Sequence, residues 1–137
     1  MHSESLLKII FQTEARLLKL AREEKYQAGL VVIERFHEKY GAVDEILVQK
    51  AFFLYHYAAY LMYGHTQDSK RKTLIKQNFE QAIDICKLVI KKQRDIDDRN
   101  FLNARLYLAQ IYAMLGRTKK AKNIARQTFK YHPSALT

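Results

Sequence analysis

Apolar residues recur at helical spacing along almost the whole chain, and this periodicity predicts six α-helices. In residues 69–94, the apolar positions Ile75, Phe79, Ile83 and Cys86 follow one another at intervals of three or four residues, which places them on one helix face. Glycine and proline occur only 4 times and once, so little interrupts the pattern. The predicted helices cover about residues 3–22, 25–40, 44–63, 68–94, 98–115 and 118–132.

The same stripes predict which side of each helix faces the core. Residues 44–63 are apolar nearly all round, so this helix should be central and contacted on both sides. Asp44 is expected to cap its first turn, and Gly41 and Gly116 are expected to end the helices before them. The residues predicted to face the core in the first, second and sixth helices are Leu6, Ile10, Leu17, Leu20, Ala28, Val31, Val32, Phe36, Ala121, Ile124, Ala125, Thr128 and Phe129.

The connections between these helices are short, which predicts an all-α fold made of three antiparallel helical hairpins. The hairpins would cover about residues 3–41, 44–94 and 98–132. A length of 137 residues fits one domain, and we treat residues 1–137 as one. Three hairpins can close into a bundle or stack into a solenoid, and an internal repeat would favour the solenoid.

The last third of the chain, LNARLYLAQIYAMLGRTKKAKNIARQTFKYHPSA (102–135), is 34 residues long and resembles a tetratricopeptide repeat. It departs from the repeat pattern at Arg105, Ala125 and Thr128, where the family has a bulky aromatic, a larger apolar and a small residue. The residues that carry the resemblance at the family's spacing are Leu108, Ala109, Tyr112, Gly116, Ala121 and Pro133. Small residues such as alanine let paired helices approach closely, and glycine permits a tight turn.

Two earlier segments are similar to the second helix of such a repeat. Ala28 and Ala82 stand there in the place that Ala121 takes in the last repeat. Their separation exceeds the repeat length, which predicts that the middle hairpin is elongated by about two turns per helix and forms a protruding tip. The resemblance therefore implies a short right-handed solenoid of three stacked hairpins. The pattern predicts no extra polar helix of the kind that usually covers the last repeat of such a solenoid. We therefore expect self-association or a partner at that end.

The resemblance also implies a function, because the first helix of each tetratricopeptide hairpin lines a concave surface that binds proteins. We interpret the chain as a non-catalytic interaction module, an adaptor or chaperone-like protein, that binds a segment of a partner protein or peptide. Plain core packing of the same aromatic residues is the alternative. The residues expected to line the groove are Phe52, Tyr55, His56, Asn103, Leu106, Gln110 and Met114.

Charge is distributed unevenly between the two halves of the chain. The net charge is +10, and residues 70–137 carry 16 basic and 5 acidic side chains. This asymmetry favours an acidic or amphipathic protein partner, with nucleic acid as an alternative. The predicted basic edge of the sixth helix and the turn before it comprises Arg117, Lys119, Lys120, Lys122, Arg126 and Lys130.

A catalytic interpretation rests on one short pattern. Arg126 and His132 enclose five residues, which resembles the arginine–histidine element of HEPN ribonucleases, and this stays an alternative function. The histidines are scattered, and the single cysteine, Cys86, lies in an apolar stripe, so we expect no metal site and no cofactor. With no apolar run long enough for a membrane span and no signal peptide, the expected compartment is the cytoplasm.

Overall fold

The computed structural model is helical in every part of the chain that it describes, residues 2–63, 68–92 and 98–131. It contains no strand within these ranges, which confirms the all-α prediction. The helices are α1 (Glu4–Arg22), α2 (Tyr26–Tyr40), α3 (Asp44–Met62), α4 (Ser69–Lys92), α5 (Arg99–Met114) and α6 (Thr118–Tyr131). The predicted bounds hold to within one or two residues, except that the segments 93–94 and 132–133 lie outside the described residues.

Capping side chains and glycines set several of these helix ends. The Ser3 hydroxyl accepts a hydrogen bond from the Leu6 backbone N–H at 3.2 Å and so caps α1. The Asp98 carboxylate does the same for the first turn of α5. Gly41 and Gly116 follow α2 and α5 with φ of 82° and 74°, a backbone conformation that favours glycine. These glycine predictions are confirmed.

Asp44 does not cap α3, and this prediction was wrong. The helix begins one residue earlier than a cap at Asp44 requires, because the Val43 carbonyl already accepts the backbone N–H of Leu47 at 2.9 Å. Asp44 therefore lies in the first turn, where its carboxylate is 3.2 Å from the ammonium of Lys92 on α4. A carboxylate in this position also interacts favourably with the positive end of the helix dipole.

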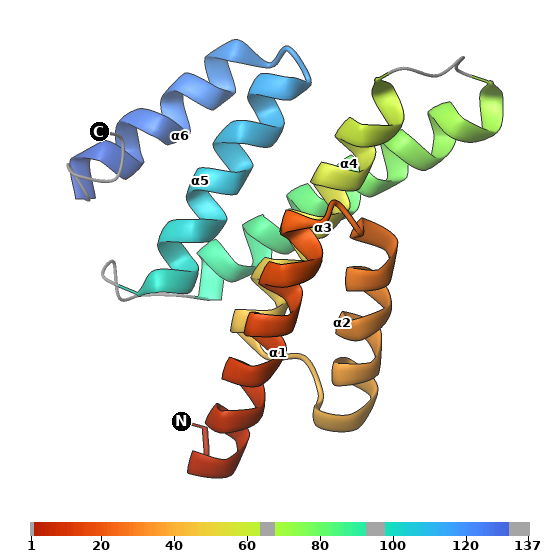
Figure 1. The fold of residues 1–137 in the computed structure, drawn as a ribbon. Coiled ribbons are helices and arrows are strands. Elements are labelled where there is room, and N and C mark those ends of the chain that lie inside the picture. Colours follow the sequence, from red (N-terminus) through yellow and green to blue (C-terminus); the bar gives the residue numbers. More distant parts are fainter. Residues whose placement is uncertain (1, 64–67, 93–97, 132–137) are drawn as a thin grey trace.

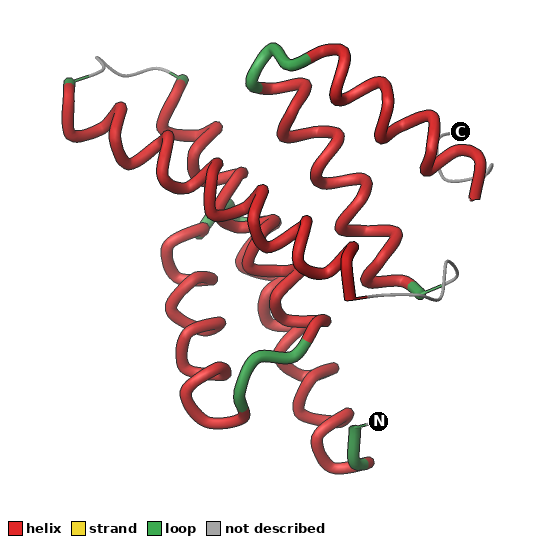
Figure 2. The backbone as a smooth tube through the Cα atoms, turned by 180° about the vertical axis from the view of Figure 1, so that it is seen from behind, coloured by secondary structure: helices red, strands yellow, loops and turns green. Residues whose placement is uncertain are grey.

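The helices contact one another mainly in chain order, with α3 at the centre (Figure 1). Each helix packs on the next one in the sequence, and α3 also packs on α1 and α5. Among the described residues α1 makes no contact with α6. In Figure 2, α1 rises from the N label in the lower part of the molecule, whereas α6 lies at the upper right, next to the C label. The central position predicted for residues 44–63 is confirmed.

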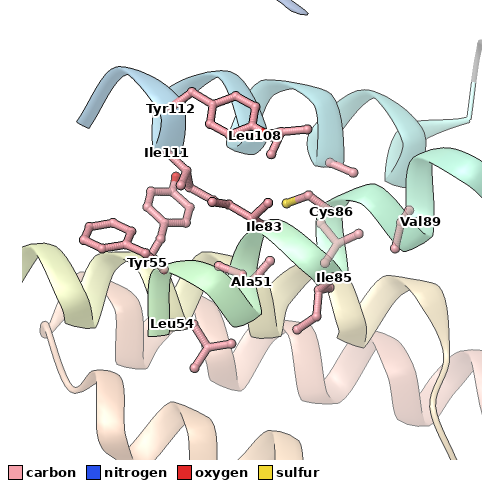
Figure 3. Close-up of a cluster of buried hydrophobic side chains, with 14 of the residues drawn as sticks. Ala51, Leu54, Tyr55, Ile83, Ile85, Cys86, Val89, Leu108, Ile111 and Tyr112 are labelled. Atoms are coloured by element: carbon pink, nitrogen blue, oxygen red, sulfur yellow. The ribbon is translucent and has the colours of Figure 1, made fainter. Parts of the chain in front are cut away.

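Two groups of buried side chains form the core on either side of α3. The larger group lies between α3, α4 and α5 and includes Tyr55, Phe79, Cys86 and Leu108 (Figure 3). The smaller one lies between α1, α2 and α3 and comprises Ile10, Leu17, Ile33, Phe36, Ile46 and Phe53. The stripes predicted for α1 and α4 are confirmed, since their members are buried or packed against these groups.

The predicted face of α2 is half correct, since Phe36 is buried and Val32 packs against the smaller group. Ala28 is exposed and Val31 has 49% of its surface exposed, whereas Gly29 and Ile33 are buried. Gly29 is a point of close approach between α2 and α3, because a Cβ atom built on it would overlap the ring of Phe53. The close approach thus uses the smallest residue, glycine, rather than the neighbouring alanine.

A buried arginine joins α5 to α6. Arg105 is 8% exposed, and its Nε donates to the Thr128 hydroxyl at 3.3 Å while its Nη2 donates to Gln127 Oε1 at 2.6 Å. Thr128, fully buried, donates its own proton to the Ile124 carbonyl at 2.7 Å. Two residues that depart from the repeat pattern, Arg105 and Thr128, are therefore hydrogen-bond partners.

Helix α6 packs on α5 through part of its predicted apolar face. Ala121 and Thr128 are buried and Ile124 and Ala125 are half-buried, as predicted. Phe129 is 48% exposed, so its predicted place in the core was wrong. Its ring lies beside Ala125 at a hollow on the outer side of α6, where the small alanine leaves room.

Candidate functional site

A hollow of about 450 Å³ crosses three helices that are not consecutive in the sequence, α1, α3 and α5. We call it the central hollow. Two apolar side chains on its α1 wall, Phe11 and Leu18, are 65% and 53% exposed, which is unusual for residues of this size. The residues that line the central hollow are Phe11, Glu14, Ala15, Leu18, Ala21, Gln49, Phe52, Arg99, Asn103 and Tyr107.

Aromatic rings form one side of the central hollow. The Phe52 ring lies 5.6 Å from the Tyr107 ring, centroid to centroid, and 5.8 Å from the ring of Tyr55 beneath them. Tyr55 and Tyr107 are also 5.8 Å apart, so the three rings form one cluster between α3 and α5. Such clusters are rigid and provide a large apolar contact area.

A hydrogen bond holds this cluster to α5. The buried hydroxyl of Tyr55 donates to Gln110 Oε1 at 2.5 Å. Burial, with smaller contributions from Tyr107 and Cys86, raises the pKa of Tyr55 well above its ordinary value, so the hydroxyl keeps its proton and stays a donor. This bond orients Gln110, whose side chain lies at the exposed edge of the helix.

Polar groups complete the walls of the central hollow. Glu14 on α1 and Arg99 at the start of α5 carry opposite charges on two sides of it, and the amides of Gln49 and Asn103 lie between. Burial raises the pKa of Glu14; the nearby Arg99 opposes this shift and Glu45 adds to it. Amide side chains can both donate to and accept from a peptide backbone.

The predicted groove residues fall into three groups in the structure. Phe52 and Asn103 line the central hollow, while Tyr55 is 1% exposed and supports the rings from below. The His56 ring lies 4.1 Å from that of Phe52 and 4.4 Å from that of Tyr55, and it also stacks on Tyr26 of α2 at 5.9 Å, but it does not line the central hollow. Gln110, Leu106 and Met114 are not among the residues that line this hollow, although Gln110 is bonded to Tyr55.

Sequence reasoning missed Tyr107 and the whole α1 wall. Tyr107 follows Asn103 by four residues and so shares its helix face. On α1, Phe11, Ala15 and Leu18 form a second apolar stripe beside the buried one at Ile10 and Leu17. A helix with two apolar stripes has more apolar surface than one neighbouring helix covers. The second stripe of α1 was therefore the feature of the sequence from which its wall of the central hollow could have been predicted.

The six cations of the predicted basic edge are exposed, and their neighbours differ. Arg117 and Lys120 both lie over the Tyr112 ring, at 5.8 and 5.5 Å from its centroid. Lys122 and Arg126 instead flank the hollow beside Phe129. Lys119 and Lys130, like the other four cations of the set, are exposed.

The described residues provide neither a metal site nor both members of the predicted ribonuclease pair. No group of three histidine, cysteine or acidic side chains in that part of the chain could hold a metal ion. His132, the proposed partner of Arg126 in a ribonuclease site, lies outside the described ranges. The helices that the structure describes are all too short or too polar to cross a bilayer.

No protein-family model, no curated protein and no solved structure matches this chain. Its function is therefore argued from the chemistry of its own surface.

Proposed function

We propose that this chain is a non-catalytic protein-interaction module with a tetratricopeptide-like architecture, and that it binds a segment of a partner protein in the central hollow. A stack of three hairpins would bring the first helices of all three hairpins to one surface. In that arrangement α1, α3 and α5 are the first helices, and they are the three that line the central hollow.

The pattern of helix contacts supports this architecture. In a stack, each helix packs on its successor, and first helices of neighbouring hairpins pack on each other. The contacts α1–α3 and α3–α5 fit this expectation, and so does the lack of contact between α1 and α6 among the described residues. A closed bundle would bring the first and last helices together.

The observation that carries the proposed function is the pair of exposed apolar side chains, Phe11 and Leu18, beside the half-buried rings of Phe52 and Tyr107. Together they offer apolar contact area next to the amides of Gln49 and Asn103 and to one charge of each sign. Apolar anchors with a few polar groups are typical of surfaces that bind peptide segments.

The test is selection of peptides from a random display library, followed by binding measurements on two matched variants. Leu18→Glu places a charge in the central hollow. Leu88→Glu makes the same change at a leucine of similar exposure, 49%, that is not among the residues lining the hollow. We expect Leu18→Glu to weaken binding of the selected peptides at least about tenfold, since a buried apolar anchor contributes about 2 kcal/mol, while Leu88→Glu leaves it unchanged.

Equal effects of the two substitutions would contradict the proposal, because they would show that the selected peptides bind elsewhere. Circular dichroism of both variants shows whether they keep their helix content. A photoreactive residue at position 103 provides an independent measurement, since it should cross-link the bound peptide, whereas the same residue at position 87 should not.

A second candidate function, nucleic-acid binding, is favoured by the composition of α6. This helix exposes Lys119, Lys122, Arg126 and Lys130 and contains no acidic residue. Binding of a 20-nucleotide RNA with an affinity that falls steeply with salt would support it. The charge reversal Lys122→Glu with Arg126→Glu should then abolish RNA binding and leave the selected peptides bound.

A further inference from the structure

The apolar stripe of α4 extends further along this helix than the part that α5 covers. Ile83 is 6% exposed and lies on the side of α4 that faces α5 (Figure 3), and Phe79 is 2% exposed. Ile75, two turns before Ile83, continues the same face and is only partly buried. Helix α4 has 24 residues and α5 has 16, and in Figure 1 the first turns of α4 lie away from α5, beside the end of α3.

A second hollow opens where the cover of α5 ends. We call it the tip hollow; its volume is about 420 Å³. It is bounded by the end of α3, one face of α4 and the turn between α5 and α6. The lining residues are Met62, Lys72, Ile75, Lys76, Phe79, Glu80, Ile83, Leu115 and Arg117.

Cations stand on both sides of this apolar floor. Lys72 and Lys76 are exposed on α4, and Arg117 is exposed on the α5–α6 turn across from them. Glu80, the one acidic side chain among the described residues of the lining, is 4.0 Å from the ammonium of Lys76. The rim therefore has a net positive charge, with Lys72 and Arg117 on opposite sides of the floor.

We propose that the tip hollow binds an acidic amphipathic helix of a partner protein. The α4 residues of the lining span three turns, from Lys72 to Ile83, which is about 16 Å at the helical rise of ~1.5 Å per residue. A helix of similar length can place an apolar stripe on Ile75, Phe79 and Leu115. Carboxylates on both flanks of that stripe then meet the cations on both sides of the floor.

The charge arrangement favours a helix over a small amphiphilic anion. A single carboxylate or phosphate head reaches one side of the hollow, whereas glutamates at both edges of a helix reach Lys72 and Arg117 together. Helix-in-groove recognition uses apolar anchors at intervals of three and four residues, the same spacing that α4 presents. The charge complementarity adds specificity and raises the association rate at low salt.

This site is separate from the central hollow and shares none of its residues. Either proposal can therefore fail alone, because the variants that test one site leave the other intact.

The experiment uses a fluorescent 15-residue peptide with leucines along one helical stripe and glutamates on both flanks. Its first control has the same composition with the leucines scattered around the helix, and its second has lysine in place of each glutamate. We expect the first peptide to bind the full chain, as measured by fluorescence anisotropy at low salt, and both controls to bind at least about tenfold more weakly.

Matched substitutions in the protein locate the bound peptide. Lys72→Gln with Lys76→Gln should weaken binding about three- to tenfold, since the two substitutions remove exposed ion pairs with the peptide and such pairs are individually weak. The same change at Lys87 and Lys91 removes two exposed charges with equal spacing from the same helix, outside the tip hollow, and should have no effect.

A second pair of variants probes the apolar floor. Met62→Glu adds a carboxylate to the tip hollow and should abolish binding. Met114→Glu makes the same change at a methionine of nearly equal exposure, 41% against 42%, that does not line this hollow, and binding should persist.

Three results would overturn the proposal. The first is equal binding of the striped and scattered peptides, and the second is equal loss in the matched variants. The third is evidence for a different occupant of the tip hollow. Such evidence would be dodecanoate monomers that bind more tightly than the peptide and no longer bind the Met62→Glu variant. It would equally be a dimer of the chain alone that sedimentation equilibrium detects in the original protein but not in the Met62→Glu variant.

Discussion

Gly29→Ala adds one methyl group at the contact between α2 and α3. Its effect on the free energy of unfolding is the sum of two opposing terms, the higher helix propensity of alanine and the cost of overpacking the core. The new Cβ would overlap Phe53 Cε1 and would lie 2.5 Å from Cδ1 and 2.8 Å from Cζ, whereas ordinary contacts are 3.4–4 Å. The Phe53 side chain is fully buried, and its ring already contacts those of Tyr26 and Phe52. It therefore has to move by roughly 1 Å into a packed core.

The sign of the net effect follows from comparing the two terms. Alanine is favoured over glycine inside a helix by about 1 kcal/mol. Overpacking a well-filled core costs about 1–3 kcal/mol, and a contact this short belongs in the upper part of that range. We expect Gly29→Ala to lower the free energy of unfolding by about 1–2 kcal/mol, measured by urea denaturation followed by circular dichroism.

A double-mutant cycle with Phe53→Leu assigns the loss to this contact. In the Phe53→Leu background the same glycine substitution should be neutral or stabilising, which gives a coupling of at least about 1 kcal/mol. Ala28→Leu, at the exposed neighbouring position, should change stability by less than about 0.5 kcal/mol. Stabilisation by Gly29→Ala, or a loss that Phe53→Leu does not relieve, would refute the packing argument.

Three further predictions concern other buried groups. Arg105→Ala should lower the free energy of unfolding by about 1–3 kcal/mol in urea titrations, because it removes a buried side chain that donates to Thr128 and to Gln127; an unchanged midpoint would contradict this. Burial raises the pKa of Cys86 to about 12, so a thiol reagent at pH 8 should label the native protein far more slowly than the urea-unfolded one, and immediate native labelling would contradict it. Burial lowers the pKa of His56 and of His37 below 6.5, so the unfolded chain takes up protons first as the pH falls. Stability should therefore decrease between about pH 7 and 5, and His56→Phe should reduce this slope in pH-dependent urea titrations; equal slopes would refute the assignment.

The helices and their order could be predicted from the sequence because their signals are local. Gly41 and Gly116 end helices through backbone conformations that only nearby residues determine. Asp98 caps α5 through the N–H groups of the next turn. Asp44 fails as a cap for an equally local reason, since either Val43 or Asp44 can begin α3 and the ion pair with Lys92, distant in the sequence, uses the Asp44 carboxylate instead.

The face of α2 could not be predicted because three consecutive apolar residues, Val31, Val32 and Ile33, and two consecutive small ones, Ala28 and Gly29, fit two registers equally well. Rotating a helix by one residue turns each side chain by about 100°. The choice depends on the side chain that α3 presents to α2. Because that side chain is the ring of Phe53, only the residue without a Cβ allows close packing.

The tip hollow was not predicted and the central hollow was predicted only at Phe52 and Asn103, since each hollow depends on how helices distant in the sequence are placed relative to one another. The central hollow combines residues from three segments of the chain, and periodicity indicates the side on which Phe52 or Asn103 lies but not the gap between helices. The tip hollow forms because α4 is eight residues longer than α5, 24 against 16, so part of α4 has no cover from α5. A helix that extends past its neighbour exposes the apolar stripe that the neighbour would have covered. Unequal helix lengths in a packed array therefore leave hollows lined by residues, such as Ile75, that the sequence alone assigns to the core.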